Sequence, residues 1–447
     1  MAYSPHTEAD HRRMLDAVGV ASIDELFDDI PDAVRADRFE VPPPLTEQQL
    51  RAELLRIAGH NAVPRISFLG AGAYRHLVPA VVSEVIGRAE FATAYTPYQP
   101  EVSQGTLQTI YEFQTMVCEL TGMDVASASH YDGATATAEA ALMACRLTRR
   151  NRVAVSTAVH PQVRRGLRTY CSGPGVEALE VPADLVEGGS GLTPVEAAAS
   201  VLDEDVACLV AQQPNFFGGV EPMRELADVA HAAGAQLVAL VEPTSLAVLE
   251  APGSYGADIV TAEGQPLGIP LSFGGPYVGL MAARMASVRQ MPGRLVGATR
   301  DAAGRRGYVL TLQAREQHIR REKAASNICT NQALCALAAT AYLTAVGPAG
   351  LREVAELSLT QARHVAAALE AAGLGERRFS APYFAEVAMR IPQAKRRHAA
   401  LRERGILAGH PLWSEYPELD DTLLLATTEL TTDEHIAELV TALDQAR

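Results

Sequence analysis

Short apolar runs alternate with helical patterns through the middle of the chain. Apolar residues recur at helical spacing over residues 104–121, and Gly122 follows as a stop signal. A second helix is predicted from Asp132, a good N-cap, to about residue 149. Strand-like runs then begin near residues 152, 176, 205, 236, 257 and 277, with helices predicted after residue 161 and over 222–233. This order predicts a mainly parallel sheet that helices cover on both faces.

The two ends of the chain differ from this middle. Residues 1–60 are polar and proline-rich, with a short amphipathic helix predicted over 24–30, so we expect an N-terminal arm or extension. Residues 61–310 form the predicted large α/β domain. Residues 311–447 begin with long alanine-rich helices and continue with strand-like pieces and a final helix from about residue 432, which predicts a small α+β domain. This outline is that of the fold-type-I pyridoxal-phosphate transferases, although an outline alone does not fix a function.

Composition narrows the class of protein. The 447 residues are 48% hydrophobic and 20% charged, as in soluble globular proteins. We find no apolar run of the roughly 18 residues that span a bilayer and no secretory signal, so we expect a cytoplasmic protein with no membrane partner. The net charge of −15 disfavours a nucleic-acid partner. The six cysteines lack CxxC spacing and paired histidines, so we interpret them as reduced core cysteines and predict no metal site.

Lysine is scarce in this chain. Nearly all basic residues are arginine, and the lysines are Lys323 and Lys395 alone. Any reaction that requires a lysine amine must therefore use one of these two residues.

Three motifs are candidates for holding a cofactor. Ser127-Ala-Ser-His-Tyr-Asp-Gly-Ala-Thr-Ala leads into a helix whose N-terminus would attract a phosphate, although it also suits a plain capped helix start. Gln212-Gln-Pro-Asn-Phe-Phe-Gly-Gly-Val follows a buried strand, where either ligand contacts or a glycine-rich turn are expected. Glu242 ends the next strand, where its carboxylate would face a pyridine nitrogen or would accept from a backbone donor. The candidate cofactor cup consists of Asp132, Gly133, Thr135 and Glu242.

The expected Schiff-base lysine is missing. In fold-type-I enzymes it lies on the turn after the strand that follows the acidic residue, and here that turn reads Glu263-Gly-Gln. Gln265 cannot form an imine because an amide nitrogen is not nucleophilic. We therefore expect no catalytic residue of this chain's own, with the Gln265 region replacing the lysine, and no covalently bound cofactor.

Four segments resemble the glycine dehydrogenase (decarboxylating) family, the P-proteins of the glycine cleavage system. They are Ala94-Tyr-Thr-Pro-Tyr-Gln-Pro-Glu-Val-Ser-Gln-Gly, Phe68-Leu-Gly-Ala-Gly-Ala-Tyr, Glu263-Gly-Gln-Pro-Leu-Gly-Ile-Pro and Arg321-Glu-Lys-Ala-Ala-Ser-Asn-Ile-Cys-Thr. The opening Tyr3-Ser-Pro-His-Thr is similar to the separate subunit 1 of this family, and the resemblance covers essentially the whole chain. The chain departs from the usual pattern at Glu242, commonly Asp, and at His130, commonly an apolar residue.

The resemblance implies a division of labour in a cytoplasmic heterotetramer. Subunit 2 would carry pyridoxal phosphate on its lysine, and this chain would complete the active site at the interface. The pair would decarboxylate glycine and transfer its aminomethyl group to the lipoyl arm of the H-protein. Residues expected to line the shared site are Tyr95, Thr96, Tyr98, Gln99 and Gln104, with interface packing as the alternative. Candidates for the lipoyl path or for anchoring a loop are Lys323, Ser326 and Asn327, with structural ion pairing as the alternative.

Two other functions stay open on the sequence. An independent pyridoxal-phosphate enzyme acting as a homodimer is disfavoured by the missing lysine. A non-catalytic scaffold that has left the complex is disfavoured by the retained segment from Tyr95 to Gln104.

Overall fold

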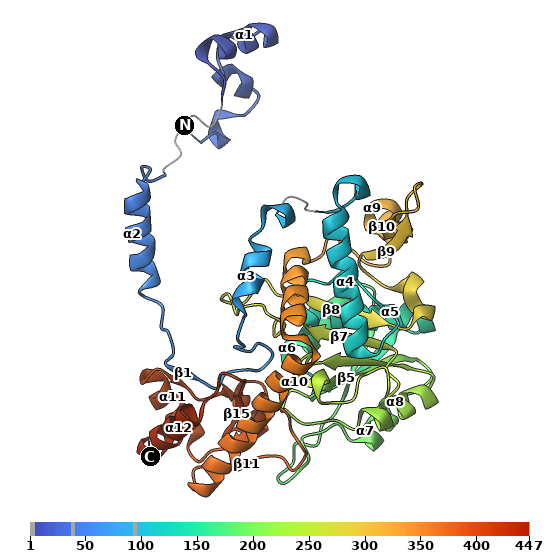
Figure 1. Cartoon of the computed structure of the whole chain (residues 1–447), viewed down its shortest axis with the longest axis vertical. Coiled ribbons are helices and arrows are strands. Elements are labelled where there is room, and N and C mark those ends of the chain that lie inside the picture. Colours follow the sequence, from blue (N-terminus) through green and yellow to red (C-terminus); the bar gives the residue numbers. More distant parts are fainter. Residues whose placement is uncertain (1–4, 37–40, 93–95, 447) are drawn as a thin grey trace. The chain divides into compact units, whose positions relative to one another are not determined.

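The computed structural model describes residues 5–36, 41–92 and 96–446 (Figure 1). The chain forms two compact units, Met1–Ala62 and Val63–Arg447. The subdivision of the second unit at residue 310 stays a prediction.

The first unit is a set of short helices. It contains α1 (Glu8–Val18), η1 (Asp24–Phe27), η2 (Asp32–Val34) and α2 (Glu47–Ala58). Capping boxes begin α1 at Thr7 and α2 at Thr46. Neither helix has a buried residue. The amphipathic helix predicted over residues 24–30 is only the four-residue 3₁₀ turn η1, because Pro31 follows closely and disfavours a helical residue before it.

A seven-stranded sheet forms the centre of the second unit, in the order β2-β8-β7-β6-β5-β3-β4. Strands β4, β3, β5, β6 and β7 pair in parallel, whereas β8 and β2 pair antiparallel at one edge. The fold class is confirmed. The strand bounds are β2 Val125–Ala126, β3 Arg152–Ser156, β4 Glu177–Val181, β5 Val206–Gln213, β6 Gln236–Val241, β7 Ile259–Glu263 and β8 Gly279–Ala283.

Helices cover both faces of this sheet, which explains why the strands are apolar along their length. Alternate residues of one strand enter different cores: Leu209 and Ala211 of β5 belong to one, and Cys208 and Val210 to the other. The first core includes side chains of α4, α7, α8 and α10, and the second those of α5 and α6. The helix bounds are α3 Ala80–Ile86, α4 Gln104–Thr121, α5 Gly133–Thr148, α6 Pro161–Ser172, α7 Val195–Val201, α8 Met223–Ala232 and α10 Ala333–Ala371.

Helix α10 corrects the expectation about apolar runs. Its 39 residues include an 18-residue window with a mean hydropathy of 1.5, so its length and composition would allow it to cross a membrane. Buried side chains of the helix, among them Ala339 and Tyr342, nevertheless belong to the main core. Gly347, with φ of 61°, precedes Pro348 and breaks the helix near the predicted boundary between two helices.

A second, antiparallel sheet organises the C-terminal part, in the order β11-β12-β15-β14. Here β11 is Glu376–Arg377, β12 Glu386–Arg390, β14 His410–Pro411 and β15 Thr422–Ala426, with α11 (Ala394–Glu403) and α12 (Asp433–Gln445) packed in the same core. Strand β1 (Ile66–Ser67) pairs in parallel with β13 (Ile406–Leu407), so the start of the second unit is joined to its C-terminal part. Two antiparallel strands that the sequence pattern did not reveal, β9 (Leu295–Arg300) and β10 (Arg306–Thr311), form a hairpin.

Cys329 corrects one part of the cysteine prediction. All six cysteines are free, and Cys171 and Cys208 are buried as expected, but Cys329 is exposed. Cys329 lies in the segment between the charged residues around Lys323 and the start of α10 at Ala333. It is therefore outside the apolar helix whose side chains join the core.

A glycine pair tests the packing between α4 and the loop before β7. A Cβ atom on Gly253 would lie 2.0 Å from the carbonyl oxygen of Gly122, whereas a Cβ atom on Gly105 meets nothing within 4 Å. We expect Gly253→Ala to lower the free energy of unfolding by about 1–3 kcal/mol through overpacking. Gly105→Ala should be neutral or stabilising, because it lies in a helix. Urea unfolding of both variants checks this, and equal stability of the two would contradict the predicted close approach.

Candidate functional site

A cavity of about 400 Å³ opens at the carboxyl ends of β5, β6 and β7. This is the edge of a parallel sheet at which ligands are usually bound. Three carboxylates line the cavity, those of Asp132, Glu242 and Glu263, and its lining contains no arginine or lysine among the residues that the structure describes. The cavity is therefore an acidic environment.

The N-terminus of α5 is already occupied by carboxylates of the chain itself. Asp132 is the N-cap, and its Oδ1 accepts from the Thr135 N–H at 2.7 Å and from the Thr135 hydroxyl at 2.9 Å. Glu263 Oε2 accepts from the Gly133 N–H at 2.9 Å. A Cβ atom on Gly133 would lie 2.7 Å from the backbone nitrogen of Glu263, so glycine permits this approach. Burial raises the pKa of Glu263 to about 7, although the hydrogen bond from the Gly133 N–H lowers it. The nearby Asp132 carboxylate adds a smaller upward shift of this pKa.

Glu242 satisfies backbone donors of its own turn. Its Oε1 accepts from the Thr244 N–H at 3.0 Å, and its Oε2 accepts from the Thr244 hydroxyl and the Ser245 N–H, both at 2.7 Å. Of the two roles open on the sequence, accepting from a backbone donor is therefore the one that this structure displays.

Gln265, at the turn predicted to lack the Schiff-base lysine, makes structural hydrogen bonds. Its side chain is 1% exposed. The amide oxygen accepts from the Tyr74 N–H at 2.8 Å, and the amide nitrogen donates to the Tyr74 carbonyl at 2.9 Å and to the Ile269 carbonyl at 2.8 Å. Neither lysine lines the cavity. Lys395 Nζ lies 5.8 Å from the centre of the Trp413 ring.

Residues 70–77, called the clamp segment here, pass between the large sheet and the C-terminal part. His160 Nε2 lies 2.8 Å from the Ala71 carbonyl, and Glu386 Oε1 accepts from the Ala71 N–H at 2.7 Å. The Tyr74 hydroxyl donates to Glu386 Oε2 at 2.8 Å. The segment thus contacts both parts of the second unit and forms one wall of the cavity.

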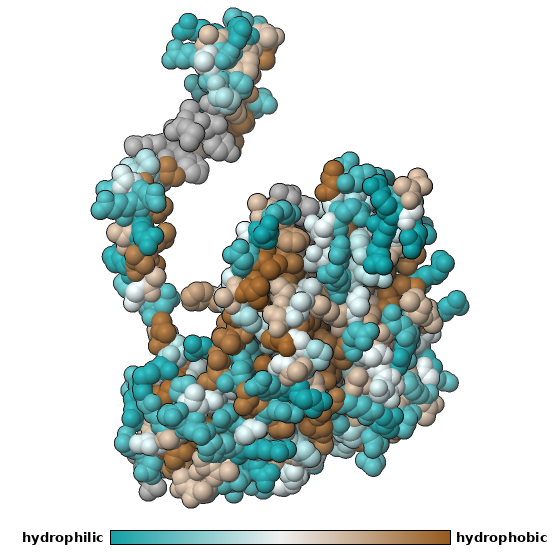
Figure 2. Space-filling model, in the orientation of Figure 1, coloured by the Kyte–Doolittle hydropathy of each residue, from teal (hydrophilic) through white to brown (hydrophobic). Residues whose placement is uncertain are grey.

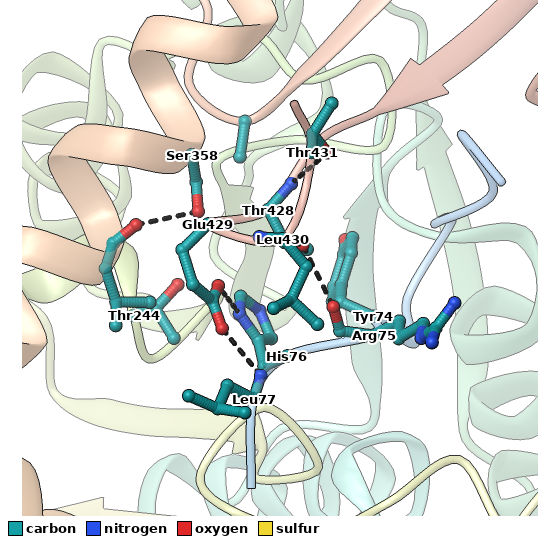
Figure 3. A network of polar contacts seen from close by, with 12 residues as sticks. Tyr74, Arg75, His76, Leu77, Thr244, Ser358, Thr428, Glu429, Leu430 and Thr431 are labelled. Atoms are coloured by element: carbon teal, nitrogen blue, oxygen red, sulfur yellow. Dashed lines mark hydrogen bonds and ion pairs between the residues drawn. The ribbon is translucent and has the colours of Figure 1, made fainter. Parts of the chain in front are cut away.

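The end of the clamp segment is held by the loop after β15 (Figure 3). His76 Nδ1 and Glu429 Oε2 lie 2.6 Å apart, and Glu429 Oε1 accepts from the Leu77 N–H at 2.6 Å. The Thr428 hydroxyl donates to the Arg75 carbonyl at 2.9 Å. Burial opposes ionisation of Glu429, but the His76 hydrogen bond and charge outweigh it and hold the pKa of Glu429 below its ordinary value. A buried contact with both oxygens of the Glu429 carboxylate engaged fixes this end of the segment.

Glu386 is a buried carboxyl beside the same segment. Burial raises its pKa to about 7, against the two hydrogen bonds from Ala71 and Tyr74, and the Glu242 carboxylate raises it further. Burial and the same two carboxylates raise the pKa of Tyr74 above its ordinary value. The hydroxyl of Tyr74 is therefore a hydrogen-bond donor and not a base near neutral pH.

The loop predicted to line a shared site lies elsewhere. Arg294, which is 2% exposed, donates from Nη2 to the Tyr98 hydroxyl at 3.0 Å, and its guanidinium lies 5.3 Å from the centre of the Tyr98 ring. The Gln104 amide donates to the Tyr308 carbonyl and accepts from the Tyr308 N–H, both at 2.9 Å. The loop is thus attached to the β9–β10 hairpin and does not line the cavity. Tyr98 remains 45% exposed, with its ring at the surface.

The other candidate residues have separate positions. Tyr95 lies outside the described residues, the Thr96 carbonyl accepts from the Tyr98 N–H at 2.9 Å, and Gln99 is exposed. The Ser326 hydroxyl donates to the buried Glu139 Oε1 at 2.7 Å, which attaches residues 326–330 to α5. Asn327 and Lys323 are exposed. Within the described chain Lys323 has no ion-pair partner, so the structural ion pairing considered for it is absent there.

Sequence reasoning missed the clamp segment as part of the site. Its motif, Phe68-Leu-Gly-Ala-Gly-Ala-Tyr, was a visible signal, but the partners of Tyr74 and His76 are 191 to 353 positions away in the chain. The unusual His130 also has a structural setting. It is fully buried, neither ring nitrogen has a partner among the described residues, and burial lowers its pKa to about 4. His130 is therefore a neutral packing residue at neutral pH.

Glu386→Gln tests the buried carboxyl. The folded-state pKa is about 7 against 4.5 for a free glutamate, so folding keeps the proton bound between these values. The free energy of unfolding should therefore fall as pH rises from about 4.5 to 7. The difference in free energy of unfolding, variant minus wild type, should therefore increase by about 2–3 kcal/mol as the pH rises from about 5 to about 8. Urea unfolding at several pH values measures this difference. Glu196→Gln on the exposed side of α7 is the control, and parallel pH curves for all three proteins would refute the assignment.

The comparisons with known proteins agree with one family along the whole chain. The family model for the glycine cleavage system P-protein matches residues 1–443. The chain is 52% identical to a probable glycine dehydrogenase (decarboxylating) subunit 1 from Moorella thermoacetica, covering 99% of both chains. It is 51% identical to a protein of the same name from Thermomicrobium roseum, covering 100% of both. A crystal structure of glycine decarboxylase (P-protein) in inhibitor-bound form matches with a TM-score of 0.92 at 45% identity over 100% of both chains. A sphingosine-1-phosphate lyase from Burkholderia pseudomallei, 18% identical with a TM-score of 0.68 over 93% of both chains, shares the fold. The chain belongs to the glycine cleavage system P-protein family.

Proposed function

We propose that this chain is the subunit of glycine decarboxylase that lacks the Schiff-base lysine. Together with a subunit 2 that carries pyridoxal phosphate, it decarboxylates glycine and transfers the aminomethyl group to the lipoyl arm of the H-protein. The observation that carries the proposal is the buried Gln265 at the turn where an imine-forming lysine is required. The full-length likeness to proteins named subunit 1 supports the same assignment.

The residues of this chain's own cavity do not suit pyridoxal phosphate, which supports placing the cofactor in the partner. A phosphate would need the α5 N-terminus, where Glu263 already accepts from the Gly133 N–H. The carboxylates of Asp132 and Glu242 would repel a phosphate at the same opening, and no cation among the lining residues offsets them. Glu242, the candidate partner of a pyridine nitrogen, is engaged with its own turn.

Exposed apolar side chains on the second unit support a protein partner. Leu77, Val81 and Leu334 are 59%, 47% and 47% exposed, and Figure 2 shows hydrophobic surface where α3 lies. Val102 and Phe273 are 80% and 97% exposed. Apolar surface of this kind marks interaction sites in soluble proteins. We infer a heterotetramer of two copies of each subunit in the cytoplasm, and the six free thiols suit a reducing compartment.

In this assembly the loop containing Tyr98 and Gln104 is the part of the chain that we assign to the shared active site. Arg294 binds the Tyr98 hydroxyl and the backbone of Tyr308 binds the Gln104 amide, so the loop is held at two points. The Tyr98 ring stays partly exposed. A loop fixed at two points can present phenol and amide groups to a polar substrate with little loss of conformational entropy on binding. Within the assembly we assign Thr96 and Gln99 to the same surface, and Tyr95 stays a candidate for the shared active site. The exposed Lys323 and Asn327 stay candidates for the lipoyl path, and Ser326 is the loop anchor.

The isolated chain should neither exchange glycine carboxyl with bicarbonate nor retain pyridoxal phosphate in equilibrium dialysis. Gln265→Lys should not change this, because Glu263 and Asp132 still occupy the α5 N-terminus. Addition of subunit 2 should restore exchange to the wild-type chain. Exchange by the chain alone, or stoichiometric retention of the cofactor by it, would show that it is an independent enzyme.

Tyr98→Phe should lower the exchange rate of the reconstituted complex about tenfold, since loss of one hydrogen bond at a site typically costs about 1–3 kcal/mol. Tyr255→Phe is the control, because this buried hydroxyl has no hydrogen-bond partner in the described chain. Rate and size-exclusion profile are measured on the same sample. A wild-type rate for Tyr98→Phe with the complex intact would reduce the loop to a packing role.

A further inference from the structure

A second cavity, of about 320 Å³, is lined by cations instead of carboxylates. It lies between the end of α5, the segment before β9 and residues 312–325. Its charged lining residues are Arg146, Arg289, Arg315, Arg320 and Lys323, and it has no acidic lining residue in the described chain. The protein has a net charge of −15, so a recess lined by five cations is a positively charged region on a negatively charged molecule.

These cations lack the partners that surface arginines usually have. Arg146 Nη2 donates to the Gln290 carbonyl at 3.1 Å, Arg315 Nη2 to the Gly293 carbonyl at 2.9 Å, and Arg320 Nε to the Ala314 carbonyl at 3.1 Å. Backbone carbonyls orient the guanidinium groups but do not neutralise them. No carboxylate of the described residues lies within ion-pairing distance of any of the five. Arg146 Nε is buried and has no hydrogen-bond partner in that part of the chain.

The carboxylates that act electrostatically on Arg146 and Arg315 are those of Glu139 and Glu316, and both have other partners. Glu139 accepts from Ser326, and Glu316 lies 3.7 Å from Arg294 Nε and 3.6 Å from His318. Burial lowers the pKa of Arg146, and the Glu139 carboxylate opposes this shift. Burial also lowers the pKa of Arg315, where the Glu316 carboxylate opposes the shift and the charge of Arg146 adds to it. The two guanidinium groups therefore repel each other in a partly desolvated recess, and an anion between them would relieve this repulsion.

We propose that this recess is a binding site for a small phosphate-bearing anion. A phosphate ester carries roughly two negative charges and three acceptor oxygens. It can therefore pair with several guanidinium groups at once, whereas a single carboxylate has one charge and two oxygens. The volume fits a small molecule or its phosphate end. The partly buried Arg146 is accessible to a compact anion and less so to a bulky acidic surface. The site is separate from the acidic cavity: α5 rises about 1.5 Å per residue, so Gly133 and Arg146 lie roughly 20 Å apart along it.

Isothermal titration of the full chain with inorganic phosphate and with pyrophosphate, at constant ionic strength, tests the proposal. Saturable binding in the millimolar range or tighter is expected, together with slower hydrogen exchange of residues 312–325. Arg146→Gln/Arg315→Gln should weaken binding about tenfold or more, because both groups donate charge-assisted hydrogen bonds. Arg320→Gln/Lys323→Gln changes only exposed residues and should also weaken phosphate binding. This second variant tests the proposal even if the first variant does not fold.

Arg305→Gln/Arg352→Gln removes two exposed cations elsewhere and is the matched control. It should bind phosphate as the wild type does. The proposal is overturned if the wild type shows no saturable binding, or if the control weakens binding as much as the cavity variants. It is also overturned if an acidic peptide binds through these residues while phosphate does not. None of these results depends on glycine decarboxylation.

Discussion

The paired hydrogen bonds between Gln265 and the backbone of Tyr74 determine how the rest of the cavity is arranged. The amide both accepts from and donates to one residue of the clamp segment, as a neighbouring strand would. A lysine at this position could donate to the Tyr74 carbonyl but could not accept from its N–H. With Tyr74 held, its hydroxyl reaches Glu386, and His76 reaches Glu429 on the far side of the segment. The glutamine therefore fixes the clamp segment against the turn after β7.

The distribution of charge follows from the same arrangement. The positive end of α5 attracts an anion, and Glu263 and Asp132 supply carboxylates there from within the chain. Buried carboxyls accumulate around this opening, and their raised pKa values show that burial and mutual repulsion are only partly offset by hydrogen bonds. The far end of the same helix has the opposite character, with Arg146 in its last turn beside other cations. One helix thus separates an acidic recess from a basic one.

The sequence predicted the local elements of this fold well and its long-range contacts poorly. Helices α4 and α5 begin and end within about two residues of the predicted positions, because apolar periodicity, the Asp132 cap and the Gly122 stop are local signals. The absence of a lysine from the turn at Gln265 was visible for the same reason. The basic cavity was not visible, because its residues come from separate segments that meet only through tertiary packing. The β9–β10 hairpin was missed although its strands are close in sequence. The two readings of Glu242 could be separated only once the positions of Thr244 and Ser245 were known. The assignment of the Tyr98 loop to a shared site stays a prediction, since a single chain does not contain that site.

A continuous set of contacts connects the Tyr98 loop with the basic cavity. Tyr98 accepts from Arg294, whose Nε lies 3.7 Å from Glu316. The residue before Glu316, Arg315, lines the cavity and donates to the carbonyl of Gly293, the residue before Arg294. Arg294 and Glu316 are both buried and have polar atoms with no hydrogen-bond partner in the described chain, so their pairing is costly to hold and sensitive to small shifts. An anion that drew Arg315 toward the cavity would act on the two backbone segments that position this pair. The loop assigned to the shared active site and the proposed anion site therefore share one set of contacts, which runs through Arg294 and Arg315.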